Sequence, residues 1–101
     1  MKLYLDDTRP APFGWELVKT APEAKQILSE HDVTDLSLDH DLGESENGTG
    51  YDVIAWIEEK VATSNYDPPR IFIHTANPSA SIRMYAALDS IKRMIEQRNN
   101  Q

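Results

Sequence analysis

The sequence predicts a small α/β domain built on a parallel, four-stranded sheet. Short apolar runs and longer amphipathic segments follow one another in the order β-β-α-β-α-β-α. Strands that are separated by helices pair in parallel through right-handed crossovers. Three of the apolar runs also end in clusters of polar side chains, and in open α/β sheets the strand ends form the edge where ligands bind. We therefore expect a three-layer arrangement of about three helices around a sheet of strand order 2-1-3-4.

The apolar runs place the four strands. We expect them at residues 2–6, 15–19, 35–39 and 70–74. Residues 8–14, between the first two strands, contain two prolines and a glycine, which indicates a loop rather than a helix. This connection is short for a parallel crossover, so the prediction of the second strand depends on the alternation of its side chains.

The three helices are indicated by their first turns and by their apolar stripes. Thr20 and Glu23 form a capping-box pattern that opens a helix ending near residue 31. A second helix is expected at residues 51–62, after an acidic loop that contains glycine. A third begins after Asn77, which is a favourable N-cap followed by proline. Its buried stripe consists of Met84, Leu88, Ile91 and Ile95.

The composition fits a single domain spanning residues 1–101 and excludes several classes of chemistry. The chain has no cysteine, which excludes disulfides, thiolate catalysis and cysteine-based zinc sites. Its formal net charge of −7 suits a long nucleic acid poorly, although it permits one phosphate group held through a metal ion. No apolar segment is long enough to span a membrane, and the N-terminus lacks the pattern of a signal peptide. We expect a cytoplasmic protein.

Carboxylates follow two of the predicted strands. One pair, Asp6 and Asp7, comes after the first strand. The other pair, Asp39 and Asp41, comes after the third strand, which is its neighbour in the expected order. Four carboxylates at one edge repel one another unless a cation lies among them, and oxygen ligands suit Mg²⁺ or Mn²⁺. Aspartates are also common in turns, but we expect all four to be metal ligands.

Polar side chains also follow the fourth strand. His74 is the expected acid–base residue, because an imidazole titrates near neutral pH and can both take and give a proton. A histidine hydrogen-bonded to the backbone fits the same position. Thr75 and Asn77 can donate hydrogen bonds to a phosphate oxygen, and Asn77 fits the role of a helix cap as well.

Two further residues lie beside these motifs. Arg9 can bind phosphate through two N–H groups, or it can pair with one of the neighbouring aspartates. His40 alternates with Asp39 and therefore points to the other side of its strand. We favour a packing role for His40 over a role as ligand or base.

With this order of elements, the chain resembles phosphoacceptor receiver domains over nearly its whole length. Such domains carry an acidic pair after the first strand, matched by Asp6 and Asp7, and a phosphoacceptor aspartate after the third, matched by Asp39. A hydroxyl residue after the fourth strand is matched by Thr75. The resemblance implies a receiver-like, flavodoxin-like fold. The chain departs from the pattern because it lacks the usual first helix, the fifth strand and the lysine that contacts the phosphoryl group.

A closer resemblance is to the divergent family of cyclic-phosphate processing receiver-like domains. Three short motifs are similar and occur in the same order: Leu-Asp-Asp-x-Arg at residues 5–9, Asp-His-Asp-Leu-Gly at 39–43, and His-Thr-x-Asn at 74–77. The resemblance implies a metal-dependent phosphoesterase or processing domain acting on a small or terminal phosphate ester, including a 2′,3′-cyclic one. His74 and Asp39 are then the catalytic candidates, and the partner is a phosphate-containing small molecule or a nucleic-acid end.

Two alternatives remain open at this stage. One is a divergent receiver switch that is phosphorylated on Asp39, against which the missing lysine counts. The other is a non-catalytic module that binds phosphate or a metal ion. The residues fit the phosphoesterase and the binding module equally.

Overall fold

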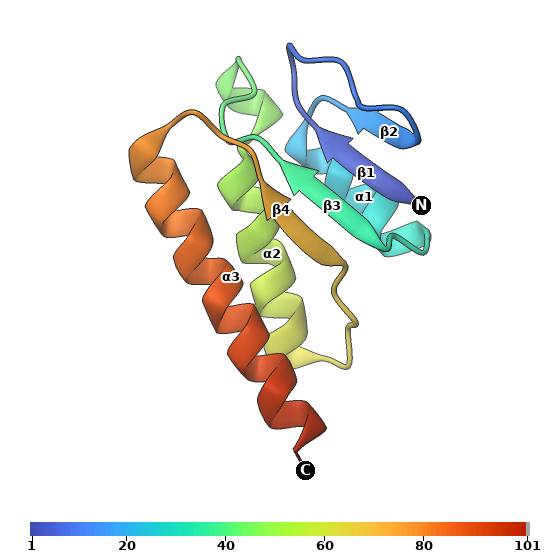
Figure 1. Ribbon diagram of the computed structural model, residues 1–101, viewed down its shortest axis with the longest axis vertical. Helices are drawn as coiled ribbons and strands as arrows, with labels where there is room; N and C mark the ends of the chain where they lie inside the picture. Colours follow the sequence, from blue (N-terminus) through green and yellow to red (C-terminus); the bar gives the residue numbers. More distant parts are fainter. Residues whose placement is uncertain (101) are drawn as a thin grey trace.

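The four strands lie side by side and parallel in the order β2-β1-β3-β4. They are β1 (Lys2–Leu5), β2 (Trp15–Val18), β3 (Asp35–Leu38) and β4 (Arg70–Ile73) in a computed structural model that describes residues 1–100. Leu5 lies opposite both Val18 and Leu38, and Leu38 lies opposite Ile73. Because the register is even, all four strands end at one edge of the sheet (Figure 1). The predicted strand order is confirmed.

Each long helix begins at a residue whose side chain accepts a hydrogen bond from the first turn. The helices are α1 (Ala21–Glu30), α2 (Gly50–Thr63) and α3 (Pro78–Asn99), with a short 3₁₀ helix, η1 (Ser45–Asn47), before α2. Thr20, Thr49 and Asn77 are the N-caps, and Thr49 forms a reciprocal capping box with Asp52. These bonds satisfy backbone N–H groups that a helix N-terminus otherwise leaves unpaired.

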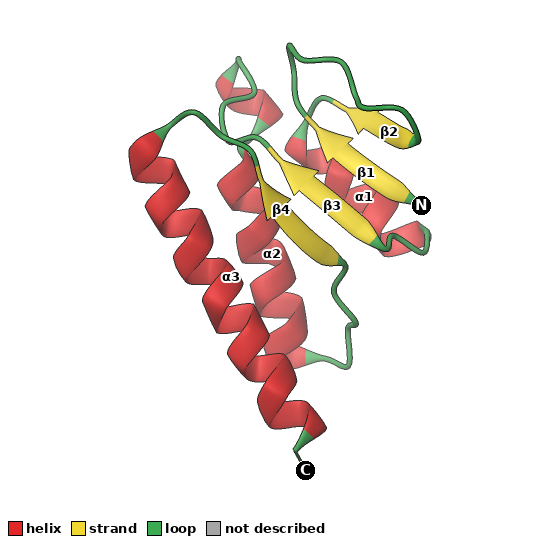
Figure 2. Cartoon of the chain, in the orientation of Figure 1, coloured by secondary structure: helices red, strands yellow, loops and turns green. Residues whose placement is uncertain are grey.

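The hydrophobic core lies between the sheet and the three helices. Leu3 and Leu5 of β1 and Leu36 and Leu38 of β3 are fully buried on this side. Figure 1 shows α1 and α2 behind the sheet, with α3 alongside α2, and Figure 2 shows the same arrangement by type of element. The crossover from β2 to β3 and the crossover from β3 to β4 move along the sheet in the same direction, so the right-handed rule places α1 and α2 on one face.

The opposite face of the sheet carries no helix among residues 1–100, so the domain has two layers. The predicted fold class, with its strand order and three helices, is confirmed, but the third layer of that prediction is absent. The reason is the connection between β1 and β2, which is a loop from residue 6 to residue 14 and contains no crossover helix. No fifth strand pairs with β4 within the described residues, and a groove of about 550 Å³ lies between β4 and α3.

The start of α2 packs closely against the end of β3. The backbone N–H of Gly50 donates to the carbonyl oxygen of His40 at 3.0 Å. A Cβ atom at position 50 would collide with the carbonyl oxygen of Asp39, so only glycine fits there. This contact fixes the backbone that carries Asp39 at the edge of the sheet. Among residues 1–100, no helix is both long enough and apolar enough to cross a membrane.

Candidate functional site

Three carboxylates meet where β1 and β3 end. Asp6 and Asp7 follow β1, Asp39 follows β3, and the N–H of Asp39 donates to the carbonyl of Leu5 at 3.0 Å. Each aspartate offers one oxygen, and these three oxygens all lie within 4.8 Å of one another. Adjacent strands thus bring together side chains more than thirty residues apart in sequence. The arrangement can hold one small cation with oxygen ligands.

Asp6 is the buried anchor of this group. Its side chain is fully buried, and it accepts hydrogen bonds from the backbone N–H groups of Thr8 and Arg9, both at 2.9 Å. The hydroxyl of Thr8, the guanidinium of Arg9 and the ring of His74 also contact its two oxygens. Burial acts to raise the pKa of the Asp6 carboxyl, but these hydrogen bonds and the charge of Arg9 together hold the pKa below its ordinary value. Asp6 is therefore ionised at neutral pH.

Asp7 and Asp39 keep more of their oxygen lone pairs available than Asp6 does. Asp39 accepts one hydrogen bond, from the N–H of His40 at 2.8 Å, and the structure shows none to the Asp7 carboxylate within residues 1–100. The loop after β3 passes over Asp7, since a Cβ on Gly43 would lie 3.4 Å from its carboxylate oxygen. The donor atoms of the three carboxylates are all oxygen, which is the type of ligand that Mg²⁺ and Mn²⁺ prefer.

His74 is held on both of its ring nitrogens. Nε2 lies 3.1 Å from Oδ2 of Asp6, and Nδ1 lies 2.7 Å from the hydroxyl oxygen of Ser37. The ring also stacks on Tyr4, with 4.5 Å between the ring centroids. Because the ionised Asp6 accepts from Nε2–H, the neutral imidazole accepts at Nδ1 from the Ser37 hydroxyl. The structure thus brings His74 into the site and defines which nitrogen faces the carboxylates.

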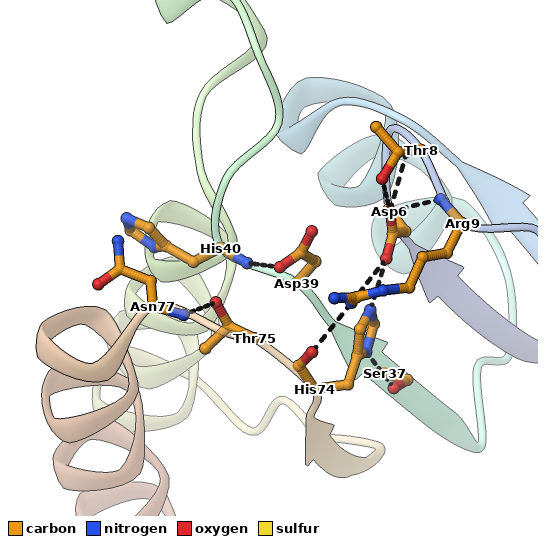
Figure 3. A network of polar contacts seen from close by, with 9 residues as sticks. All are labelled: Asp6, Thr8, Arg9, Ser37, Asp39, His40, His74, Thr75 and Asn77. Atoms are coloured by element: carbon orange, nitrogen blue, oxygen red, sulfur yellow. Dashed lines mark hydrogen bonds and ion pairs between the residues drawn. The ribbon is translucent and has the colours of Figure 1, made fainter.

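Arg9 pairs with Asp6, as one of the two sequence-based alternatives proposed. One of its terminal nitrogens lies 3.3 Å from Oδ2 of Asp6 and 3.1 Å from the carbonyl oxygen of His74. Its side chain is 48% exposed. Figure 3 shows the guanidinium lying between the carboxylate of Asp6 and the backbone oxygen of His74. The group can therefore hold the two strand ends together and still present N–H donors to an anion.

The remaining polar residues after β3 and β4 contact one another or the first turn of α3. Asp41 is exposed, and the structure does not bring it into the group; its Oδ2 lies 3.5 Å from Nδ2 of Asn77. Asn77 caps α3 by accepting from the N–H of Ala80 at 3.1 Å. The hydroxyl oxygen of Thr75 accepts from the N–H of Asn77 at 3.1 Å. Thr75 and Asn77 thus shape the turn into α3, and their phosphate contacts stay a prediction.

His40 lies on the other side of the chain from Asp39, as alternation along the strand predicted (Figure 3). Its side chain is 8% exposed, and its Nδ1 atom has no hydrogen-bond partner within the described residues. It does not belong to the three-carboxylate group.

Sequence reasoning missed two residues of the site. Ser37 shares a face of β3 with Asp39, so the period of two along a strand was the signal that could have found it. Thr8 contacts Asp6 through both its N–H and its hydroxyl, a pattern that short polar residues form after a strand-ending aspartate.

One family of known domains matches most of the chain. The model of the cyclic-phosphate processing receiver domain matches residues 1–90. The chain belongs to this family. As a cyclic-phosphate processing receiver domain, it is a receiver-type domain linked to the processing of cyclic phosphates, with an acidic cluster at the receiver position. No curated protein and no solved structure matches the chain.

Proposed function

We propose that this domain is a metal-dependent phosphoesterase that opens a small or terminal cyclic phosphate ester. The observation that carries the proposal is the group of three carboxylate oxygens within 4.8 Å of one another, beside a histidine and an arginine, in a member of the cyclic-phosphate processing receiver family. Asp7 and Asp39 are the proposed metal ligands. When bound, Mg²⁺ or Mn²⁺ polarises a phosphoryl oxygen and lowers the pKa of an attacking water.

Arg9 and the turn into α3 supply the anion contacts in this proposal. The guanidinium of Arg9 donates to a phosphate oxygen from the side opposite its contact with Asp6. The α3 N-terminus, which follows Thr75 and Asn77, favours negative charge through the dipole of the helix. Both features stabilise the charge that builds up on the phosphoryl oxygens when water attacks.

His74 supplies the proton in this proposal. Water forms a new P–O bond, one ring P–O bond breaks, and the leaving oxygen must take a proton. Nε2 of His74 faces the carboxylates and holds the proton shared with Asp6, whereas Nδ1 is occupied by Ser37. In this proposal His74 acts as the imidazolium, with Nδ1–H donating to Ser37, and its Nε2 proton passes to the leaving oxygen. The imidazole that remains is neutral, and the proton released by the attacking water restores the imidazolium. Such general acid catalysis is worth about a hundredfold to ten-thousandfold in rate.

The test is an incubation of the pure protein with Mg²⁺ or Mn²⁺ and a panel of 2′,3′-cyclic nucleotides, followed by separation of the 2′- and 3′-phosphate products. We expect metal-dependent ring opening that Asp39→Asn abolishes and that Asp89→Asn, an exposed aspartate on α3, leaves intact. Metal-independent turnover, or equal turnover by both variants, would contradict the proposal. If no ester is opened, a module that binds without turnover becomes the better description.

One observation favours a second candidate. Asp39 follows β3 and accepts only one hydrogen bond within the described residues, which leaves an oxygen free to accept a phosphoryl group. A regulatory receiver switch would use this atom. Incubation with a small phosphate donor, followed by intact mass measurement, distinguishes the two candidates, because a stable mass increase that Asp39→Asn removes belongs to the switch alone.

A further inference from the structure

The face of the sheet that no helix of the described part of the chain covers displays a continuous cluster of rings. Tyr4 and His74 stack with their planes within 5° of parallel. Trp15 meets Tyr4 edge to face at 6.1 Å and meets Phe72 in the same way at 6.4 Å. These four rings, which we call the aromatic face, come from β1, β2, β4 and the residue after β4. Phe72 is 49% exposed, so the cluster is open to a ligand.

The aromatic face is continuous with the candidate site through His74. The ring that stacks on Tyr4 is the same ring that contacts Asp6. Along β1, Tyr4 precedes Asp6 by two residues, which is roughly 7 Å on a strand. This distance is on the scale that a ribose spans between its phosphate and its base. A phosphate held through a metal ion at the carboxylates would therefore leave a base attached through ribose within reach of the rings.

Cationic side chains border the aromatic face, although the protein as a whole is acidic. The amino group of Lys2 lies 5.7 Å from the centre of the Trp15 ring. Arg70 is 77% exposed and pairs with Asp35 at 2.9 Å. With Arg9 at the strand ends, cations thus lie at both ends of the cluster, which suits a ligand that combines rings with phosphate.

We propose that the aromatic face binds the nucleobase of the substrate, so that the domain acts on a nucleoside cyclic phosphate, such as one at an RNA end, rather than on a cyclic phosphate without a base. This inference rests on the proposed function for the position of the phosphate. Aromatic side chains on an open four-stranded sheet are a known way to stack single-stranded bases, and stacking tolerates any base because every base has a π face. The continuity of His74 with the carboxylates favours this ligand over a second copy of the chain.

The first experiment reads the aromatic face directly by tryptophan fluorescence. Trp56 lies on α2 and packs against Tyr66, away from the aromatic face, so Trp56→Phe leaves Trp15 as the only tryptophan. Titration with 2′,3′-cyclic AMP in the presence of Mg²⁺ should quench Trp15 and shift the base protons upfield in the NMR spectrum. Glycerol 1,2-cyclic phosphate, which has no base, should do neither.

The second experiment removes one ring. Phe72→Ala should weaken the binding of 2′,3′-cyclic AMP by about tenfold, the scale of one lost base–aromatic contact, and leave the binding of glycerol 1,2-cyclic phosphate unchanged. Ile82→Ala is the matched control, because Ile82 is an exposed apolar residue on α3 outside the cluster. Phe72→Leu keeps the apolar volume without a π face and serves if the alanine variant does not fold.

The outcomes separate this inference from the proposed function. Equal binding and ring opening of the two cyclic phosphates, with no quenching of Trp15, overturns the base-binding role and leaves the phosphoesterase intact. Quenching of Trp15 without any turnover keeps the base-binding role and removes the phosphoesterase. If Phe72→Ala converts a dimer to a monomer in sedimentation and does not change nucleotide binding, the face belongs to a second copy and the inference is wrong.

Discussion

Nε2 of His74 lies 3.1 Å from Oδ2 of Asp6, although 68 residues separate them in the sequence. Asp6 follows β1 and His74 follows β4, and the two side chains meet in front of β3, which lies between those strands. The small side chain of Ser37 on β3 leaves the space in which the imidazole ring lies, and its hydroxyl contacts the other ring nitrogen. These two contacts fix the orientation of the His74 ring and place its Nε2–H toward Asp6.

Turnover is expected to depend on His74 more than on His40. His74→Ala should lower the rate of cyclic-phosphate opening by at least roughly a hundredfold, because the leaving oxygen loses its proton donor, with little change in Mn²⁺ affinity. His31→Ala, in an exposed position, is the control, and His40→Ala is the comparison. A collapse of Mn²⁺ binding in His74→Ala would instead make the histidine a ligand.

Divalent-ion binding is expected to depend on Asp39 more than on Asp52. Asp52 accepts from the N–H of Thr49 in the capping box of α2 and lies outside the three-carboxylate group. Titration calorimetry with Mn²⁺ should therefore show a loss of affinity in Asp39→Asn and near wild-type affinity in Asp52→Asn. Equal affinities in the two variants would assign Asp39 a structural role.

Gly50→Ala is expected to lower the free energy of unfolding, because the new methyl group collides with the carbonyl oxygen of Asp39. Overpacking typically costs about 1–3 kcal/mol, and we expect a loss of at least this size. Gly14→Ala is the matched control. Nothing lies within 4 Å of its new methyl group, so it loses only about 1 kcal/mol for a φ of 88°. Urea unfolding measures both free energies. If Gly50→Ala lowers the free energy of unfolding less than Gly14→Ala does, the start of α2 can move away from β3 without destabilising the fold, and the prediction is wrong.

The ion pair at the other end of β3 is expected to make stability depend on acid pH. The Thr34 hydroxyl first, and then Arg70, hold the pKa of Asp35 below its ordinary value, against the opposing effect of burial. A lowered pKa in the folded state adds stability that is present above the unfolded pKa and is lost as pH falls through the folded pKa. Asp35→Asn should thus be less stable than wild type at pH 7, and the difference should shrink below about pH 4.

The control for this prediction is Asp89→Asn, whose aspartate is exposed on α3. Its unfolding free energy should follow that of the wild type across the pH range. A difference between Asp35→Asn and wild type that stays constant from pH 7 to the acid limit of folding would contradict the linkage.

Much of the fold could be predicted because its signals are local. The caps at Thr20 and Asn77, the apolar stripe of α3 and the period of each strand are properties of neighbouring residues. The same alternation located the ends of the strands, where the polar residues lie. The rule of right-handed crossovers then predicted the strand order. The family motifs, which lie at these strand ends, led to the family that the comparison confirms.

The sequence by itself thus determined the elements, their order and the edge at which Asp6, Asp7 and Asp39 meet. Only the tertiary structure decided that Asp41 turns toward Asn77, that Ser37 and Asp6 both contact His74, and that none of the helices within residues 1–100 covers one face of the sheet. The physical reason is that periodicity assigns a side chain to a face, whereas its contacts depend on the register and size of residues on other strands. Those neighbours are brought together only when the chain folds.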